Sequence, residues 1–171
     1  MKNNVRGSLP VGYRLYGESF TYEIEEVLGQ GSFGITYLAH IIFEGKLGSL
    51  KKIKQLVAVK EFYMRDINTR DESYILNGSK AETFQNYHRR FRKEAENLSK
   101  MDHSGIVDVM EIFEANGTSY YVMDFLSGGT FHQYIKERGK LPSIEALQFI
   151  LKIGDALGYM HTPRMLHLDL K

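Results

Sequence analysis

The chain has 171 residues, of which 43% are hydrophobic and 25% are charged, and its formal net charge is +1. This composition is typical of a globular protein with its own core, and so small a charge excludes a general attraction to nucleic acids or anionic membranes. The absence of cysteine excludes disulfides and thiol chemistry, and no segment has the apolar length of a signal-peptide core or a membrane span, so we expect a cytoplasmic protein.

The first twenty residues contain several glycines and a proline, which predicts a loosely structured arm over residues 1–20. The stretch EEVLGQGSFGITYLAHIIF follows at residues 25–43, with Gly29, Gly31 and Gly34 in G-x-G-x-x-G spacing. In a dinucleotide-binding fold the last glycine would lead directly into a helix. Here β-branched and aromatic residues follow it, so the glycines are predicted to join two strands of a hairpin. Such a hairpin either holds a phosphate or is only flexible, and the pattern alone fits both.

Residues 44–55, EGKLGSLKKIKQ, are rich in lysine and glycine, which favours a solvated loop over a basic docking patch. The next stretch, QLVAVKEF at residues 55–62, alternates as a strand does, with Lys60 and Ala58 on one face and Glu61 on the other. A lysine is therefore expected beside a small residue on a largely apolar face.

Residues 81–101 carry apolar side chains at three- and four-residue spacing, which predicts an amphipathic helix. The apolar stripe consists of Phe84, Tyr87, Phe91, Ala95 and Leu98. Glu94 falls at the edge of this stripe and Glu96 on the opposite side, so Glu94 is the carboxylate expected to face inward.

Residues 106–126 contain two strand-like runs around Asn116-Gly117, a dipeptide that favours a hairpin turn. The predicted total is five strands with one helix inserted after the third. After a glycine-containing connector, Thr130 is expected to cap a short helix, and Pro142-Ser143 to open a longer helix that ends near His161.

Taken singly, Lys60, Glu94 and Asp169 are most simply surface residues. In order, however, the glycine hairpin, VAVK, the inward glutamate, the Gly-Gly connector, the long helix and His-x-Asp-x-Lys resemble a eukaryotic-type serine/threonine protein kinase over about residues 20–171. The stretches GQGSFGITYLAH, VAVKEF and LHLDLK look most like bacterial members of that family.

The resemblance implies an α+β fold, in which a kinase N-lobe of five antiparallel strands and one helix precedes the first helices of a truncated helical C-lobe. It divides the chain into an arm at residues 1–20, the N-lobe and hinge at 21–126, and the start of the C-lobe at 127–171.

The resemblance also implies an ATP site. Its nucleotide-binding residues would be Leu28, Gly29, Gly31, Phe33, Gly34, Thr36, Ala58, Lys60, Met123, Asp124, Phe125 and Leu126. Lys60 would contact the α and β phosphates and pair with Glu94, because a lysine on an apolar face needs anionic partners. Asp169 would accept the proton of the substrate hydroxyl, and Lys171 would lie near the transferred phosphate, as in the serine/threonine subtype.

Two departures from the family pattern affect the expected activity. Leu168 stands where an arginine usually binds a phosphorylated activation loop. The family's magnesium ligands would follow Lys171, so no metal ligand is assigned, and the chain is expected to be catalytically incompetent by itself. The alternative interpretation is a non-catalytic, pseudokinase-like interaction module.

The expected partners are ATP and a protein substrate, without nucleic acid or membrane. The predicted helix at residues 143–161 has more apolar surface than the small lobe could cover, including Leu147, Ile150 and Leu151. Uncovered apolar surface of this size favours association, so a homodimer through the helical half is expected.

Overall fold

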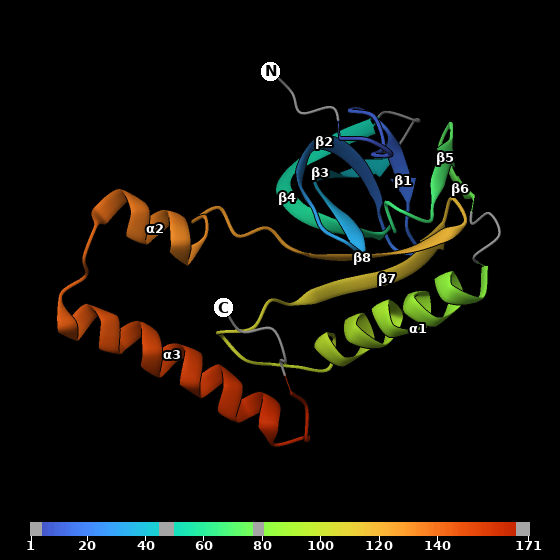
Figure 1. The fold of residues 1–171 in the computed structure, drawn as a ribbon. Coiled ribbons are helices and arrows are strands. Elements are labelled where there is room, and N and C mark those ends of the chain that lie inside the picture. Colours follow the sequence, from blue (N-terminus) through green and yellow to red (C-terminus); the bar gives the residue numbers. More distant parts are fainter. Residues whose placement is uncertain (1–4, 45–49, 77–80, 167–171) are drawn as a thin grey trace. The chain divides into compact units, whose positions relative to one another are not determined.

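The computed structural model describes residues 5–44, 50–76 and 81–166, and the chain forms two compact units (Figure 1). The first unit contains Met1–Ser99 and Val109–Phe125, and the second contains Lys100–Asp108 and Leu126–Lys171. Among the described residues, all of the strands and helix α1 (Ala81–Leu98) fall in the first unit, whereas α2 (Phe131–Arg138) and α3 (Ser143–His161) fall in the second.

The first unit is built on a curved antiparallel sheet in the order β1-β2-β3-β4-β8-β7 (Figure 1). Its strands are β1 (Arg14–Tyr16), β2 (Thr21–Gln30), β3 (Gly34–Glu44), β4 (Leu50–Phe62), β7 (Val109–Ala115) and β8 (Thr118–Asp124). A separate hairpin consists of β5 (Thr69–Asp71) and β6 (Tyr74–Leu76). Helix α1 contacts β7 and β8, so a segment that follows β4 and β6 in the chain covers strands that come later.

The core of the first unit combines the strands with the apolar stripe of α1. On β2, Tyr22 and Ile24 are buried with more exposed neighbours between them, as the two-residue period of a strand requires. On α1, Phe84 and Phe91 are buried, and their rings lie 5.1 and 5.4 Å from that of Phe62 on β4. The amphipathic helix predicted at residues 81–101 is therefore present and packs through the predicted stripe.

The arm and the strand count differ from the sequence-based expectation. The main sheet has six strands, because Leu15 of the arm pairs with Tyr22 and adds β1 at the edge. Leu9 and Leu15 are both buried, and the Leu9 N–H donates to the Tyr37 hydroxyl at 3.1 Å. The prediction of a loosely structured arm is therefore wrong for its described part: isolated apolar residues between glycines have no periodicity, yet the sheet offers them a place to pack.

The predicted loop at residues 44–55 is also shorter than expected. Strand β3 continues to Glu44 and β4 begins at Leu50, with Ile42 opposite Lys52 and Glu44 opposite Leu50. Residues 45–49 lie outside the described part of the chain. The lysines at positions 51, 52 and 54 resemble loop composition, yet they lie within β4, whose pairing with β3 is formed by backbone groups.

A buried ion pair joins the arm and the β5–β6 hairpin to the sheet. The Arg70 guanidinium donates to the Glu61 carboxylate at 2.6 Å, and the two side chains are only 6% and 0% exposed. The hydroxyls of Tyr37 and Tyr120 donate to the same carboxylate. Arg70 also donates to the Gly7 carbonyl at 2.6 Å, so one side chain holds three segments together.

The two helices of the second unit start where the sequence predicts. Thr130 caps α2 in a capping box with Gln133, and α3 starts directly after Pro142. The two helices contact each other through the rings of Phe131 and Phe149, whose centroids are 4.7 Å apart. Arg138 of α2 forms an ion pair with Glu145 of α3 at 3.0 Å.

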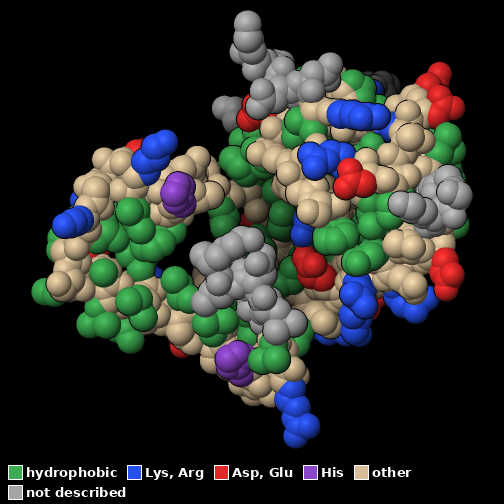
Figure 2. Space-filling model, in the orientation of Figure 1, with side chains coloured by type: hydrophobic (Ala, Val, Ile, Leu, Met, Phe, Trp, Pro, Cys, Tyr) green, Lys and Arg blue, Asp and Glu red, His purple; other side chains and the backbone are tan. Residues whose placement is uncertain are grey.

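Helix α3 exposes much of its apolar surface. No residue of this helix, all of which the structure describes, is fully buried. Its exposed large apolar side chains are Ile144, Leu147, Ile150, Leu151, Ile153 and Tyr159. Figure 2 shows hydrophobic side chains gathered at the surface of the helical unit. In the described ranges, no helix combines the length and apolar character needed to cross a bilayer.

Candidate functional site

The three glycines join two strands, as predicted from the residues that follow them. Strand β2 ends at Gln30, β3 begins at Gly34, and the Gly31 N–H donates to the Gly34 carbonyl at 2.9 Å. The pairing shifts between Val27 and Gly29, which is a local irregularity next to the turn. The turn therefore leads into a strand and not into the phosphate-binding helix of a dinucleotide fold.

The glycines differ in what surrounds them. A Cβ atom at Gly34 would lie 2.8 Å from the Glu61 carbonyl oxygen, a distance that real side chains do not tolerate. A Cβ atom at Gly29 or Gly31 would meet nothing within 4 Å. Gly34 therefore lets the hairpin lie close to β4, while Gly29 and Gly31 leave open space in which a ligand could approach the backbone.

The tip of the hairpin is attached to α1. The Phe33 ring stacks on the Tyr87 ring with centroids 4.7 Å apart and an angle of 17° between the planes. Phe33 remains half exposed, and its carbonyl accepts from the Tyr63 N–H at 3.4 Å. The glycine hairpin is thus connected to the same helix that carries Glu94.

The structure brings Lys60 and Glu94 together. Lys60 lies on β4, opposite Thr36 of β3, and its Nζ is 3.1 Å from Oε1 of Glu94 on α1. The Lys60 side chain is 29% exposed and that of Glu94 is 53% exposed. Both groups therefore remain accessible to a ligand, and the ion pair by itself contributes little stability because water screens it.

Tyr121 completes this cluster and was missed by sequence reasoning. Its hydroxyl accepts a hydrogen bond from Lys60 Nζ at 2.8 Å and donates one to Glu94 Oε1 at 3.1 Å. Burial, followed by the nearby Glu94 charge, raises the pKa of the Tyr121 phenol well above its usual range, so the hydroxyl stays protonated. The sequence carries no local signal for this contact, which follows from the register of β8 on β4: Ala58 lies opposite Met123 and Lys60 opposite Tyr121.

The residues predicted to surround adenine are brought together in part. Ala58 is buried on β4 between Leu38 of β3 and Met123 of β8. Leu28 on β2 is exposed. Asp124 ends β8 and Phe125 follows it, whereas Leu126 belongs to the second unit.

The predicted catalytic pair Asp169 and Lys171 lies outside the described residues, as does Leu168. Their predicted roles therefore stay predictions. Within the part of the chain that is described, no cluster of three or more histidine, aspartate or glutamate side chains could hold a metal ion.

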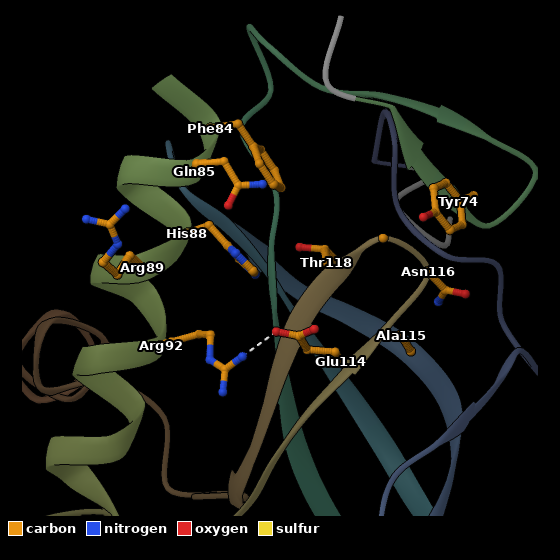
Figure 3. A pocket seen from close by; sticks show the side chains of 11 residues that line it. Tyr74, Phe84, Gln85, His88, Arg89, Arg92, Glu114, Ala115, Asn116 and Thr118 are labelled. Atoms are coloured by element: carbon orange, nitrogen blue, oxygen red, sulfur yellow. Dashed lines mark hydrogen bonds and ion pairs between the residues drawn. The ribbon is translucent and has the colours of Figure 1, made fainter. Parts of the chain in front are cut away.

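A pocket of about 760 Å³ lies elsewhere on the first unit, between α1 and the β7–β8 turn (Figure 3). Its walls include His88 and Arg89 of α1, and Arg92 forms an ion pair with Glu114 of β7 across it. The His88 ring lies 2.6 Å from the Ser119 hydroxyl, and burial lowers its pKa. None of the predicted nucleotide-binding residues lines this pocket, so it is separate from the cluster around Lys60.

Comparison with known proteins agrees with this arrangement. The chain is 31% identical over 150 residues to myosin light chain kinase A of Dictyostelium discoideum, covering 88% of this chain and 42% of that protein. It is 30% identical over 161 residues to the serine/threonine-protein kinase PrkC of Bacillus subtilis, covering 94% of this chain and 21% of PrkC. The chain thus spans less than half the length of either curated relative.

Solved structures lead to the same fold. The structure titled "PpkA-294 apo form" matches with a TM-score of 0.79 and 28% identity, over 96% of this chain and 56% of that one. The PknI kinase domain of Mycobacterium tuberculosis matches with a TM-score of 0.64 at 23% identity, a likeness of fold alone. The expected fold, a sheet with one helix followed by part of a helical lobe, is confirmed. A model of the protein kinase domain matches residues 22–171, so the chain belongs to the protein kinase domain family.

Proposed function

We propose that this chain is the ATP-binding part of a serine/threonine protein kinase, which transfers a phosphoryl group from ATP to a protein hydroxyl. The observation that carries the proposal is the Lys60–Glu94 pair beside a glycine hairpin, in a chain of this family. A cytoplasmic location, where ATP and protein substrates are abundant, is part of the proposal.

Several features of the described residues support the binding of a nucleoside triphosphate. Open space at Gly29 and Gly31 would let phosphate oxygens approach backbone N–H groups, and Lys60 is accessible enough to neutralise their charge. Ala58 and Met123 would contact the adenine, and backbone groups from Asp124 onward would bind its edge. In this proposal, Asp169 orients the substrate hydroxyl and accepts its proton, and Lys171 lies beside the transferred phosphate.

Magnesium is the metal that kinases of this family use with ATP, and it neutralises the charge that develops on the phosphates. The described residues do not fit a protein-held metal site, because they contain no suitable cluster of ligands. In the family pattern the magnesium ligands follow the position of Lys171, and on that ground we propose that the 171 residues bind ATP weakly and do not transfer its phosphate on their own.

Titration with ATP tests the binding part of this proposal. Lys60→Ala should weaken ATP binding by roughly ten-fold or more, because it removes the cation that faces the phosphates. Lys93→Ala is the matched control, since Lys93 is an exposed lysine of α1 whose partner is Glu96 at 3.8 Å. Equal ATP affinity in the wild-type chain and Lys60→Ala would refute the assignment of Lys60.

A phosphorylation assay tests the catalytic part. The 171-residue chain should give no transfer to a generic basic protein with ATP and Mg²⁺, and a chain extended past Lys171 by a segment that carries the family's magnesium ligands should give transfer that Asp169→Asn abolishes. Transfer by the 171 residues alone, lost in Asp169→Asn, would contradict the expected incompetence. An extended chain that binds ATP without any transfer would support the non-catalytic alternative.

We also propose that two copies associate through the second unit. The exposed leucines and isoleucines of α3 form an apolar surface of the kind that marks an interaction site. A two-fold arrangement would let the same surface of each copy cover the other.

A further inference from the structure

We infer that Tyr121 is a positioning residue of the nucleotide site: its hydroxyl holds the Lys60 ammonium and the Glu94 carboxylate in the arrangement that receives a phosphate. The inference rests on the proposed function and extends it to Tyr121, a residue outside the lysine–glutamate pair. Its basis is a closed ring of three hydrogen bonds, Lys60 to Tyr121, Tyr121 to Glu94 and Lys60 to Glu94, at 2.8, 3.1 and 3.1 Å.

The donors and acceptors of this ring balance. A phenol has one O–H donor. The Tyr121 O–H donates a hydrogen bond to Glu94, and the phenol oxygen accepts one from Lys60. A lysine ammonium has three N–H donors, and two of them are used within the ring. One N–H of Lys60 therefore remains for a phosphate oxygen, and its direction is set by the other two.

Tyr121 can fix this direction because it is the rigid member of the cluster. Tyr121 is only 2% exposed, and its ring lies 5.0 Å from that of Phe91 on α1. The Lys60 ammonium is also 5.2 Å from the centre of the Tyr121 ring, within the range of a cation–π contact. Lys60 and Glu94 are long side chains with substantial exposure, so without Tyr121 their pairing would be weak and variable.

The arrangement has a consequence for ligand preference. A ligand with phosphates can place an anionic oxygen against the oriented ammonium, whereas adenosine has no phosphate to do so. Removal of the Tyr121 hydroxyl should therefore weaken binding of ADP without changing binding of adenosine. A residue that only stabilised the fold would alter both affinities alike.

The test compares ADP and adenosine binding by calorimetry, without added metal, in the wild-type chain and in Tyr121→Phe. This variant keeps the ring and removes one oxygen. Tyr121→Phe should lose roughly ten-fold in ADP affinity, since a hydrogen bond to a charged group is lost, and should keep the adenosine affinity. Tyr120→Phe is the matched control, because the hydroxyl of the next residue donates to Glu61 and not to the cluster. It should leave the ratio of the two affinities unchanged even where it lowers stability.

The outcomes separate this inference from the proposed function. If the wild-type chain binds ADP and Tyr121→Phe has the same ratio of ADP to adenosine affinity, or a higher one, the role of Tyr121 is refuted while the proposed function stands. A higher ratio would mean that the hydroxyl competes with the phosphate for Lys60. If the wild-type chain does not bind ADP, the proposed function fails and this inference fails with it.

Discussion

Replacement of Arg70 by methionine should strongly destabilise the first unit. Methionine keeps an unbranched apolar stem, but it leaves the Glu61 carboxylate without its cation in a position that is 0% exposed. The hydroxyls of Tyr37 and Tyr120 would remain as donors, yet neither supplies a charge. Removal of one partner from a buried ion pair typically costs about 3–5 kcal/mol.

The expected loss is large compared with the stability of the whole unit. Domains of this size unfold with a free energy of about 5–15 kcal/mol, so the variant should be near the limit of folding at 37 °C. Arg70 also donates to the carbonyls of Gly7 and Ser73, both at 2.6 Å, so the arm and the β5–β6 hairpin each lose a hydrogen bond at the same time. We therefore expect Arg70→Met to lower the free energy of unfolding by at least about 3 kcal/mol.

Urea denaturation followed by near-ultraviolet circular dichroism would measure this loss, because buried tyrosines of the first unit provide the signal and the chain has no tryptophan. Arg65→Met is the matched control: Arg65 is 63% exposed and 4.0 Å from Asp66, so its loss should cost less than about 0.5 kcal/mol. The double variant Glu61→Gln/Arg70→Met should recover part of the stability, because no buried charge remains unpaired. A loss below about 1 kcal/mol in Arg70→Met would refute the reasoning.

Two further predictions concern His88 and α3. Burial lowers the pKa of His88 in the folded state below the ordinary value of about 6.5; the charge of Glu114 opposes this shift and that of Arg92 adds to it. The unfolded state therefore binds the proton more readily, and stability is lost as the pH falls below about 6.5. The melting temperature should therefore fall less between pH 7.5 and 5 in His88→Gln than in the wild type, and equal falls would contradict this. Sedimentation velocity at micromolar concentration should show a dimer or larger species of the wild-type chain. Leu151→Glu should weaken this association, because Leu151 is 62% exposed on the apolar face of α3, whereas the control Lys152→Glu should leave it intact. A monomeric wild-type chain would exclude the association.

Local patterns were sufficient to predict most of the helices and strands. The stripe of Phe84, Phe91 and Ala95 predicted α1, and Thr130 predicted the start of α2, because both signals depend on residues within one or two turns. The β-branched residues after Gly34 likewise excluded a dinucleotide fold without any knowledge of tertiary contacts. The position of Glu94 at the edge of the apolar stripe correctly indicated the side of α1 that approaches Lys60.

Features that depend on contacts between distant segments were not predicted. Leu15 pairs with Tyr22 to form β1, and Arg70 reaches Glu61 from a separate hairpin, but neither residue belongs to a periodic pattern that would indicate burial. Glu61 would be read as the exposed position of a strand, because a carboxylate is buried only where other segments provide its donors. Those donors come from residues 24 to 59 positions away for the tyrosines and nine positions away for Arg70.

The amino-acid sequence by itself determined the family of this protein, and it identified Lys60 as the candidate phosphate ligand and Glu94 as the partner of Lys60, because motif spacing and helical periodicity are properties of the chain. Only the tertiary structure decided that Tyr121 joins them. The hydroxyl of Tyr121 reaches both groups because β8 pairs with β4 in one particular register, and because α1 packs against β8 at the height of Glu94. Strand register is set by the burial of whole faces of the sheet, and a shift of one residue would have turned this hydroxyl to the opposite face.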